Sequence, residues 1–169
     1  TDGVSIPFEK NGLDNTSIFT IPAIGDGYVA IAGRDFVLYL LDLKTGKEVW
    51  RYNHPNSWVL STAIYDGKVI AGSGVAAFVH ANDLKTGKLL WQFKTKSPVY
   101  SSFTFANGLM YFGDMLTGNI YGLDPRTGQQ KWLFPMGYMS FSTPVVSGNT
   151  VFCSSEEGTL YAVRGISAD

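Results

Sequence analysis

The sequence predicts an all-β domain, a β-propeller built from four-stranded antiparallel blades. Two observations support this fold class: a regular internal repeat, and short apolar stretches separated by glycine turns. The motif DLKTGKEVW, which begins at Asp42, returns as DLKTGKLLW at Asp83 and as DPRTGQQKW at Asp124, at equal intervals along the chain. A period of about 41 residues is typical of propeller blades and also of paired-helix repeats, so the local pattern must decide between them.

The local pattern favours strands. Each unit divides at glycine turns into apolar stretches rich in Val, Ile, Tyr and Phe, without the i, i+3, i+4 periodicity that a helix needs. The third unit reads YSSFTF, an NG turn, LMYFG, NIYGLD, a TG turn and QQKWLF. Its inner stretches are almost continuously apolar, which is typical of a sheet covered on both faces. The blades of a propeller are covered in this way.

The chain of 169 residues is expected to form one domain, residues 1–169, with four repeats. The repeats span about residues 16–56, 57–97, 98–138 and 139–169. In the last repeat, Arg164 stands where the others have an aspartate, and neither a TG turn nor a tryptophan follows it. The outermost strand of that repeat is therefore expected to be missing.

The repeated motif itself predicts a structural role. An Asp carboxylate can accept backbone N–H bonds within the turn, Thr can do so more weakly, and Gly supplies a positive φ angle. The tryptophan that follows begins the outer strand, where its ring can lie against the next blade and its N–H can find a carbonyl. Active sites rarely need three equal copies, whereas packing contacts do. The predicted structural residues are Asp42, Gly46, Trp50, Asp83, Gly87, Trp91, Asp124, Gly128 and Trp132.

The segments LYLLDLKTGKEVW, VHANDLKTGKLLW and IYGLDPRTGQQKW resemble the tryptophan-docking repeat of the quinoprotein-like propellers. This family includes the pyrroloquinoline quinone (PQQ) dehydrogenases and the non-catalytic, BamB-like assembly lipoproteins, and the resemblance covers about residues 16–163. It implies blades whose innermost strands line a central channel. It also implies a setting outside the cytoplasm, such as the periplasm.

Two ways of completing the ring remain open. Residues 3–10, GVSIPFEK, could supply the missing outer strand of the fourth repeat, with Phe8 in the place of the lost tryptophan. Alternatively, the four repeats are half of a larger, eight-bladed ring, completed by a second copy in a homodimer or by further sequence. The half-ring is preferred, because the blade pattern resembles that of larger rings and a ring of fewer blades must tilt its blades more steeply.

No catalytic residue, cofactor or metal ion is expected. The resemblance implies that redox members hold a quinone and calcium in the channel, often beside a vicinal disulfide, which Cys153 as the single cysteine cannot form. The inner stretches TIPAI, STAIY, SFTFA and STPVV are apolar or small. Cys153 is expected to be a buried, inert thiol, His80 a packed strand residue and His54 a solvated loop residue.

Composition excludes two classes of partner. The 13 Lys and Arg residues nearly balance the 14 Asp and Glu residues, and the net charge of −1 gives no electrostatic reason to bind nucleic acid. No apolar run is long enough to span a bilayer, so direct membrane insertion is not expected.

The loops that differ between repeats are the expected binding surface, because the repeated parts hold the scaffold. Family topology gathers the loops between second and third strands, and the crossings between blades, at one rim. Aromatic residues, Met and Arg are enriched in interface cores. The candidate partner-binding residues are Arg34, Asp35, His54, Trp58, Tyr100, Asp114, Met136, Tyr138, Phe141, Glu156 and Glu157, with Met139 beside them.

The sequence thus predicts a non-catalytic binding or scaffold module that recognises a protein or peptide through this rim. Two other functions remain open: a fragment of a PQQ-dependent dehydrogenase, and a carbohydrate-binding propeller whose rim aromatics serve as sugar platforms. The same aromatic rings could instead plug the central channel.

Overall fold

The computed structural model describes Ile18 and residues 20–164, and within that part of the chain every regular element is a β-strand. The first sheet contains β1 (Ala23–Gly25), β2 (Tyr28–Ala32), β3 (Val37–Asp42) and β4 (Glu48–Asn53). The second contains β5 (Val59–Tyr65), β6 (Lys68–Ser73), β7 (Phe78–Asp83) and β8 (Leu89–Lys94). The third contains β9 (Thr104–Ala106), β10 (Leu109–Gly113), β11 (Asn119–Leu123) and β12 (Gln130–Pro135). The fourth contains β13 (Val145–Ser147), β14 (Thr150–Ser154) and β15 (Leu160–Arg164).

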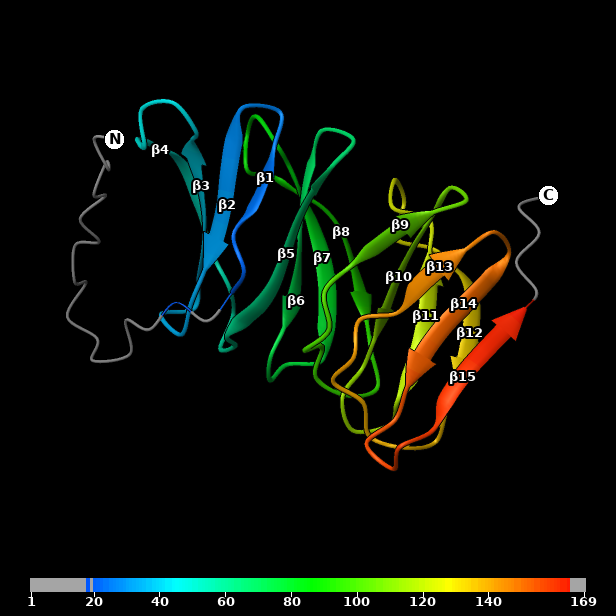
Figure 1. Ribbon diagram of the computed structural model, residues 1–169. Helices are drawn as coiled ribbons and strands as arrows, with labels where there is room; N and C mark the ends of the chain where they lie inside the picture. The colour runs from blue at the N-terminus through cyan, green and yellow to red at the C-terminus, as the bar shows by residue number, and fades with distance from the viewer. Residues whose placement is uncertain (1–17, 19, 165–169) are drawn as a thin grey trace, which may run out of the picture.

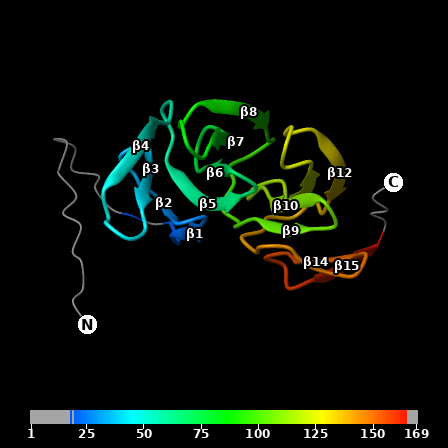
Figure 2. The same cartoon turned by 90° about the horizontal axis from the view of Figure 1, so that it is seen from above.

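Each sheet is antiparallel, and its strands follow one another in chain order, which is the topology of a propeller blade. The sheets stand side by side along an arc, with β1–β4 at one end and β13–β15 at the other (Figures 1 and 2). The predicted fold class, a β-propeller with four-stranded antiparallel blades, is confirmed. The predicted closing strand, residues 3–10, lies outside the described residues.

The hydrophobic core lies between neighbouring sheets rather than inside any one of them. Ala30 and Leu40 of the first sheet pack against Val69 and Ala71 of the second, and all four side chains are fully buried. Equivalent clusters join the second sheet to the third and the third to the fourth. The middle strands of a blade are therefore covered on both faces, which explains their continuous apolar sequence.

The TG turns have the hydrogen bonds that the motif predicts. In the first, the Asp42 carboxylate accepts bonds from both the backbone N–H and the hydroxyl of Thr45, each at 2.7 Å. The side-chain bond from Thr45, followed by the backbone bond, lowers the pKa of Asp42. Gly46 has a φ of 69° and donates its N–H to the Asp42 carbonyl at 2.8 Å. A side chain at that φ would be strained, so the glycine is required by the backbone.

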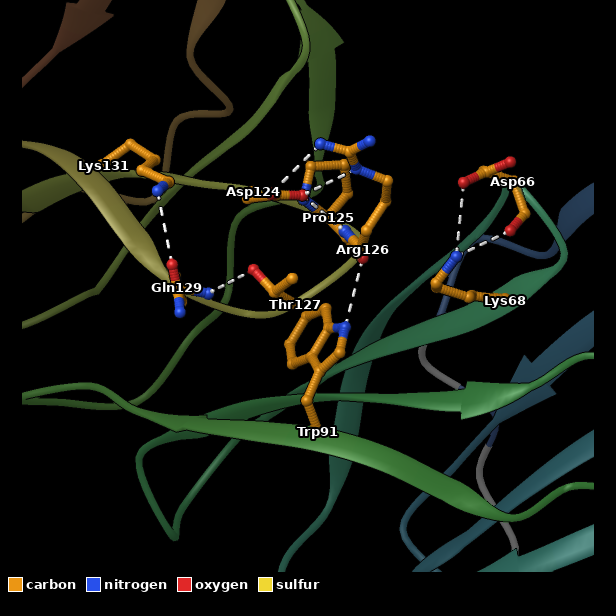
Figure 3. A network of polar contacts seen from close by, with 9 residues as sticks. All are labelled: Asp66, Lys68, Trp91, Asp124, Pro125, Arg126, Thr127, Gln129 and Lys131. Carbon is orange, nitrogen blue, oxygen red and sulfur yellow. Dashed lines mark hydrogen bonds and ion pairs between the residues drawn. The ribbon is translucent and has the colours of Figure 1, made fainter.

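The tryptophans connect each blade to the next. The indole N–H of Trp50 donates to the carbonyl of Leu84 at 2.8 Å, and that of Trp91 donates to the carbonyl of Pro125 at 3.1 Å (Figure 3). Both acceptors lie in the TG turn of the following sheet. A Cβ atom added to Gly128 would lie 2.7 Å from the Trp91 ring, so the glycine also leaves room for the indole.

The fourth sheet differs from the others, as the sequence predicts. It has three strands, β13–β15, and no fourth strand pairs with β15 among the described residues. The TG turn that would receive Trp132 is likewise absent from the described part of the chain, and Trp132 instead packs against Tyr111 at 6.0 Å between ring centroids.

Candidate functional site

The loops between second and third strands and the crossings between blades lie at one edge of the arc, the lower edge of Figure 1. We call this edge the crossing rim. It is held together by backbone bonds from each crossing to the preceding loop. His54 N–H donates to Phe36 O at 2.6 Å, and Thr95 N–H donates to Ala77 O at 2.9 Å. The predicted gathering of these segments at one rim is therefore present in the structure.

Two serines fasten the crossings more tightly. The Ser57 hydroxyl accepts N–H bonds from Val75 and Ala76, each at 3.1 Å, and the Ser97 hydroxyl accepts one from Leu116 at 2.9 Å. Both serines are buried, so these bonds form away from water. The side chains that follow them in the chain therefore extend from backbone that these hydrogen bonds hold in place.

Three of the predicted rim residues each contact the strand residue that occupies the same position in successive repeats. The Tyr39 hydroxyl donates to Asp35 at 2.7 Å, and the Tyr121 hydroxyl donates to Asp114 at 2.9 Å. His80 occupies the same repeat position, and its partner is His54. Asp35, Asp114 and His54 therefore help to hold the rim in place.

The expectation that His54 is solvated is wrong. The residue is only 3% exposed, and its ring lies against Phe78 and His80 of the second sheet. Its Nε2 lies 2.8 Å from Nε2 of His80, and its ring stacks on Phe78 with centroids 4.7 Å apart. Burial lowers the pKa of His54 to about 4 and that of His80 to about 3, the latter with a contribution from His54. Both imidazoles are neutral near pH 7, so one Nε2–H donates to the other.

Asp114 and Met136 are also interior residues, which corrects their placement on the binding surface. Asp114 is fully buried and accepts bonds from the Thr117 hydroxyl at 2.6 Å and the Asn119 N–H at 3.1 Å. Met136 is 6% exposed and packs in the apolar cluster between the third and fourth sheets. Neither side chain can contact a partner in this arrangement, because the loops around them cover them.

Arg34, Trp58 and Tyr100, which the sequence places on the rim of three different repeats, come together around one pocket. Leu60 also lines it among the described residues, and the pocket volume is about 250 Å³. The guanidinium carbon of Arg34 lies 4.5 Å from the centre of the Trp58 ring, a cation–π contact. We call this feature the rim pocket.

Exposed apolar side chains continue from the rim pocket toward the fourth sheet. Tyr100 and Phe141 meet edge to face, with ring centroids 5.9 Å apart, and Tyr138 and Met139 lie on the same crossing as Phe141. All four are at least 36% exposed. The crossing that carries the last three is fixed by a bond from Ser140 N–H to Met115 O at 2.9 Å. We call Tyr100, Tyr138, Met139 and Phe141 the aromatic strip.

The two remaining candidates, Glu156 and Glu157, are exposed in the loop between β14 and β15. The Glu156 N–H donates to Met139 O at 2.9 Å, so this acidic loop adjoins the end of the aromatic strip. The rim thus carries a cation beside the pocket and two carboxylates at its other end.

Among the described residues, no group of three or more His, Cys, Asp or Glu side chains could hold a metal ion. Cys153 is buried, as predicted, and burial raises the pKa of its thiol to about 11, so little thiolate forms near neutral pH. A mainly apolar pocket with two aromatic side chains in its lining suits a ligand with an aromatic or aliphatic group.

Leu60 is the lining residue that sequence reasoning missed. It lies two residues after Trp58 and near the start of β5, and alternate residues of an extended chain point to the same side. This alternation was the available signal, but an apolar residue in a strand is usually explained by the core.

No helix in the described part of the chain is long and apolar enough to cross a membrane.

Together, the evenly repeated motif, the antiparallel blades and the indole contacts between them define a PQQ-like β-propeller. The model of the family described as "Outer membrane protein assembly factor BamB" matches residues 11–167. The chain belongs to this family. No curated protein sequence matches it significantly.

Solved structures support the same fold. BamB from Moraxella catarrhalis superposes with a TM-score of 0.76 at 23% identity, over 87% of this chain and 46% of BamB. The computationally designed Ika4 protein gives 0.77 at 19% identity, over 91% of this chain and 94% of Ika4. Quinohemoprotein alcohol dehydrogenase from Comamonas testosteroni gives 0.73 at 20% identity, over 85% of this chain and 33% of the enzyme. This chain therefore spans about half the length of BamB and a third of the dehydrogenase.

Proposed function

We propose that this chain is a non-catalytic binding module that recognises a protein or peptide through the crossing rim. The rim pocket takes an apolar side chain of the partner, and the aromatic strip extends the contact along the rim. The family description, which names a protein assembly factor, supports an extracytoplasmic role of this kind.

The observation that carries the proposal is the convergence of Arg34, Trp58 and Tyr100 on one pocket. These residues come from three repeats and are far apart in the chain, yet they meet beside further exposed aromatic side chains. Trp, Tyr and Arg are the residue types that dominate binding energy at interfaces. A rigid backbone beneath them lowers the entropy lost on binding.

Neither alternative function is favoured by a specific observation at the rim. The likeness to the quinohemoprotein dehydrogenase, at 20% identity, supports the fold alone. Exposed aromatic rings could stack on sugars as well as on peptide side chains, so the test below includes glycans.

The experiment selects peptides from a random displayed library on the purified chain and then measures their affinity for variants by calorimetry. Trp58→Ala and Tyr100→Ala are expected to weaken binding at least tenfold each, because each removes a ring from the pocket wall. Arg34→Leu is also expected to weaken binding, because it removes the cation–π contact that holds the Trp58 ring at the pocket.

Leu43→Ala is the matched control, because Leu43 is 49% exposed but lies in a TG turn at the opposite edge. It should leave the affinity unchanged. Peptides that bind Trp58→Ala and Tyr100→Ala as well as the unmodified chain would refute the proposal. Binding on a glycan array that is lost in the same two variants would favour the carbohydrate alternative, and binding of added PQQ with calcium would favour the redox one.

A further inference from the structure

One loop position on the crossing rim changes in character from sheet to sheet. Val75, Leu116 and Glu157 occur at equal intervals in the sequence, each in the loop between the second and third strands of its sheet. The residue before each of them donates its backbone N–H to the adjoining crossing, at 2.7 to 2.9 Å. The three side chains therefore occupy equivalent places along the rim.

At this position Val75 and Leu116 are apolar and exposed, by 53% and 54%. Neither belongs to a hydrophobic cluster of the described residues. Their loops are held in this conformation, because the Val75 N–H donates to the Ser57 hydroxyl and the Leu116 N–H donates to the Ser97 hydroxyl. Single exposed apolar residues are common on protein surfaces, so these two are informative only if they adjoin others.

Backbone bonds place both residues beside exposed apolar side chains of the rim. The residue before Val75 donates its N–H at 2.8 Å to the carbonyl of Trp58, which lines the rim pocket. The residue before Leu116 accepts a bond at 2.9 Å from the N–H of Ser140, on the crossing that carries most of the aromatic strip. Exposed apolar side chains thus follow the rim from the second sheet to the fourth. We call Val75, Leu116 and the aromatic strip together the apolar row.

The apolar row ends at two carboxylates. Glu157 has the same position in the fourth sheet as Leu116 in the third, and the Glu156 N–H donates to the carbonyl of Met139 in the aromatic strip. Both glutamates are exposed, and neither forms an ion pair within the part of the chain that the structure describes. This position is also exposed in the second and third sheets, each of which is followed by a crossing. Its exposure is therefore a property of the loop and does not depend on how the fourth sheet continues.

We propose that the partner segment bound by the crossing rim is apolar at one end and basic at the other. Its apolar side chains lie along the apolar row, and a Lys or Arg side chain faces Glu156 and Glu157. Complementary charges at an interface fix the orientation of a partner and suppress wrong partners. They also favour a protein over a membrane surface, because anionic headgroups would be repelled by the two carboxylates. This inference rests on the proposed function, since both concern the same rim.

The test uses synthetic peptides that share an apolar half of Leu and Trp residues and differ in the other half, which is three Lys, three Gln or three Glu residues. Calorimetry at low and high salt measures their affinity for the purified chain. The lysine peptide should bind about three- to tenfold more tightly than the glutamine peptide, because exposed ion pairs contribute modestly, and the glutamate peptide should bind most weakly. The preference should shrink at high salt. The double variant Glu156→Gln, Glu157→Gln should lose it.

Leu116→Ala should weaken all three peptides by about threefold or more, because it shortens the apolar row. The bond from its N–H to Ser97 is a backbone bond, so the loop should remain folded, and circular dichroism checks this. Leu43→Ala and Glu48→Gln are the matched controls, since both residues are exposed and lie in or beside the first TG turn at the opposite edge. They should change neither the affinity nor the preference for lysine.

Three outcomes would overturn the inference. Peptides that depend on Trp58 and Tyr100 but show no preference for lysine would overturn it and leave the proposed function standing. Peptides that bind Trp58→Ala and Tyr100→Ala as well as the unmodified chain would refute both proposals. Binding of the chain to phosphatidylcholine vesicles, if it is lost in Leu116→Ala, would assign the apolar row to a membrane surface instead of a protein.

Discussion

At the scale of single residues, a glycine in a TG turn is needed for two separate reasons, its backbone angle and the space it leaves for the indole ring. Gly128 supplies a positive φ of 73° and leaves room for the Trp91 ring. Gly108, in an NG turn, has the same φ of 73°, but no atom lies within 4 Å of the place where its Cβ would be. The two positions therefore separate the cost of the backbone angle from the cost of displacing the indole.

Gly108→Ala should lower the free energy of unfolding by about 1–2 kcal/mol, the cost of the left-handed backbone for a residue with a Cβ. Gly128→Ala should lower it by about 1–3 kcal/mol more, because the new methyl group overlaps the Trp91 ring. Urea unfolding of both variants measures the difference. Equal losses would show that Trp91 moves aside without cost.

The histidine pair predicts a pH dependence of stability. His54 and His80 are the only histidines of the chain, and burial holds the pKa of each below the ordinary value of about 6.5. In the unfolded chain both imidazoles take up protons as the pH falls below about 6.5, while in the folded chain they stay neutral until about pH 4. The folded state therefore loses stability between these pH values, by up to about 1.4 kcal/mol per pH unit for each histidine.

Urea unfolding at a series of pH values from 8 to 4 tests this expectation. His80→Tyr is the informative variant, since tyrosine occupies this position in the other three repeats, and it should flatten the pH dependence. An unchanged slope in that variant would mean that the carboxylates, and not the histidines, govern acid unfolding.

At the scale of the element, the loop between β10 and β11 depends on one buried carboxylate. Asp114 accepts hydrogen bonds from Thr117, Asn119 and Tyr121, which close the loop over the third sheet. Asp114→Ala should cost about 2–4 kcal/mol of unfolding free energy, because the donors are left without an acceptor in a buried place. Thermal unfolding compares it with Glu48→Ala.

Glu48 is the suitable comparison because its side chain is 35% exposed and its ion pair with Arg51 lies at the surface. Exposed pairs contribute little, so that variant should change stability by less than about 1 kcal/mol. A loss in Asp114→Ala no larger than this would show that water replaces the carboxylate in the loop.

Much of the fold could be predicted because the sequence repeats about every 41 residues. Three copies of one turn and one tryptophan fix the blade length, and apolar runs fix the strands. The rim was predicted less well, because a polar residue in a loop looks solvated when only its neighbours in sequence are known. Asp114 and His54 are buried by Tyr121 and His80, whose approach depends on the tertiary arrangement of strand and crossing.

At the scale of the whole molecule, stability is expected to spread only between neighbouring blades. Trp50→Phe removes the bond to Leu84 and should speed amide hydrogen exchange in the first and second sheets while leaving the third unchanged. Trp91→Phe should instead affect the second and third sheets. Exchange measured peptide by peptide separates these outcomes, and a uniform increase in either variant would indicate one cooperative unit.

The indole contacts also constrain how the length of such a chain can change. Trp50 and Trp91 each reach a carbonyl and a bare glycine that lie one repeat further along the chain. Excision of residues 57–97 as a block would bring Trp50 to the turn at Pro125 and Gly128, which offers the same two groups. Excision of half a repeat would leave the Trp50 indole without an acceptor carbonyl and without a glycine beside it. Insertions and deletions that leave the protein folded are therefore expected to add or remove whole repeats, that is, whole blades.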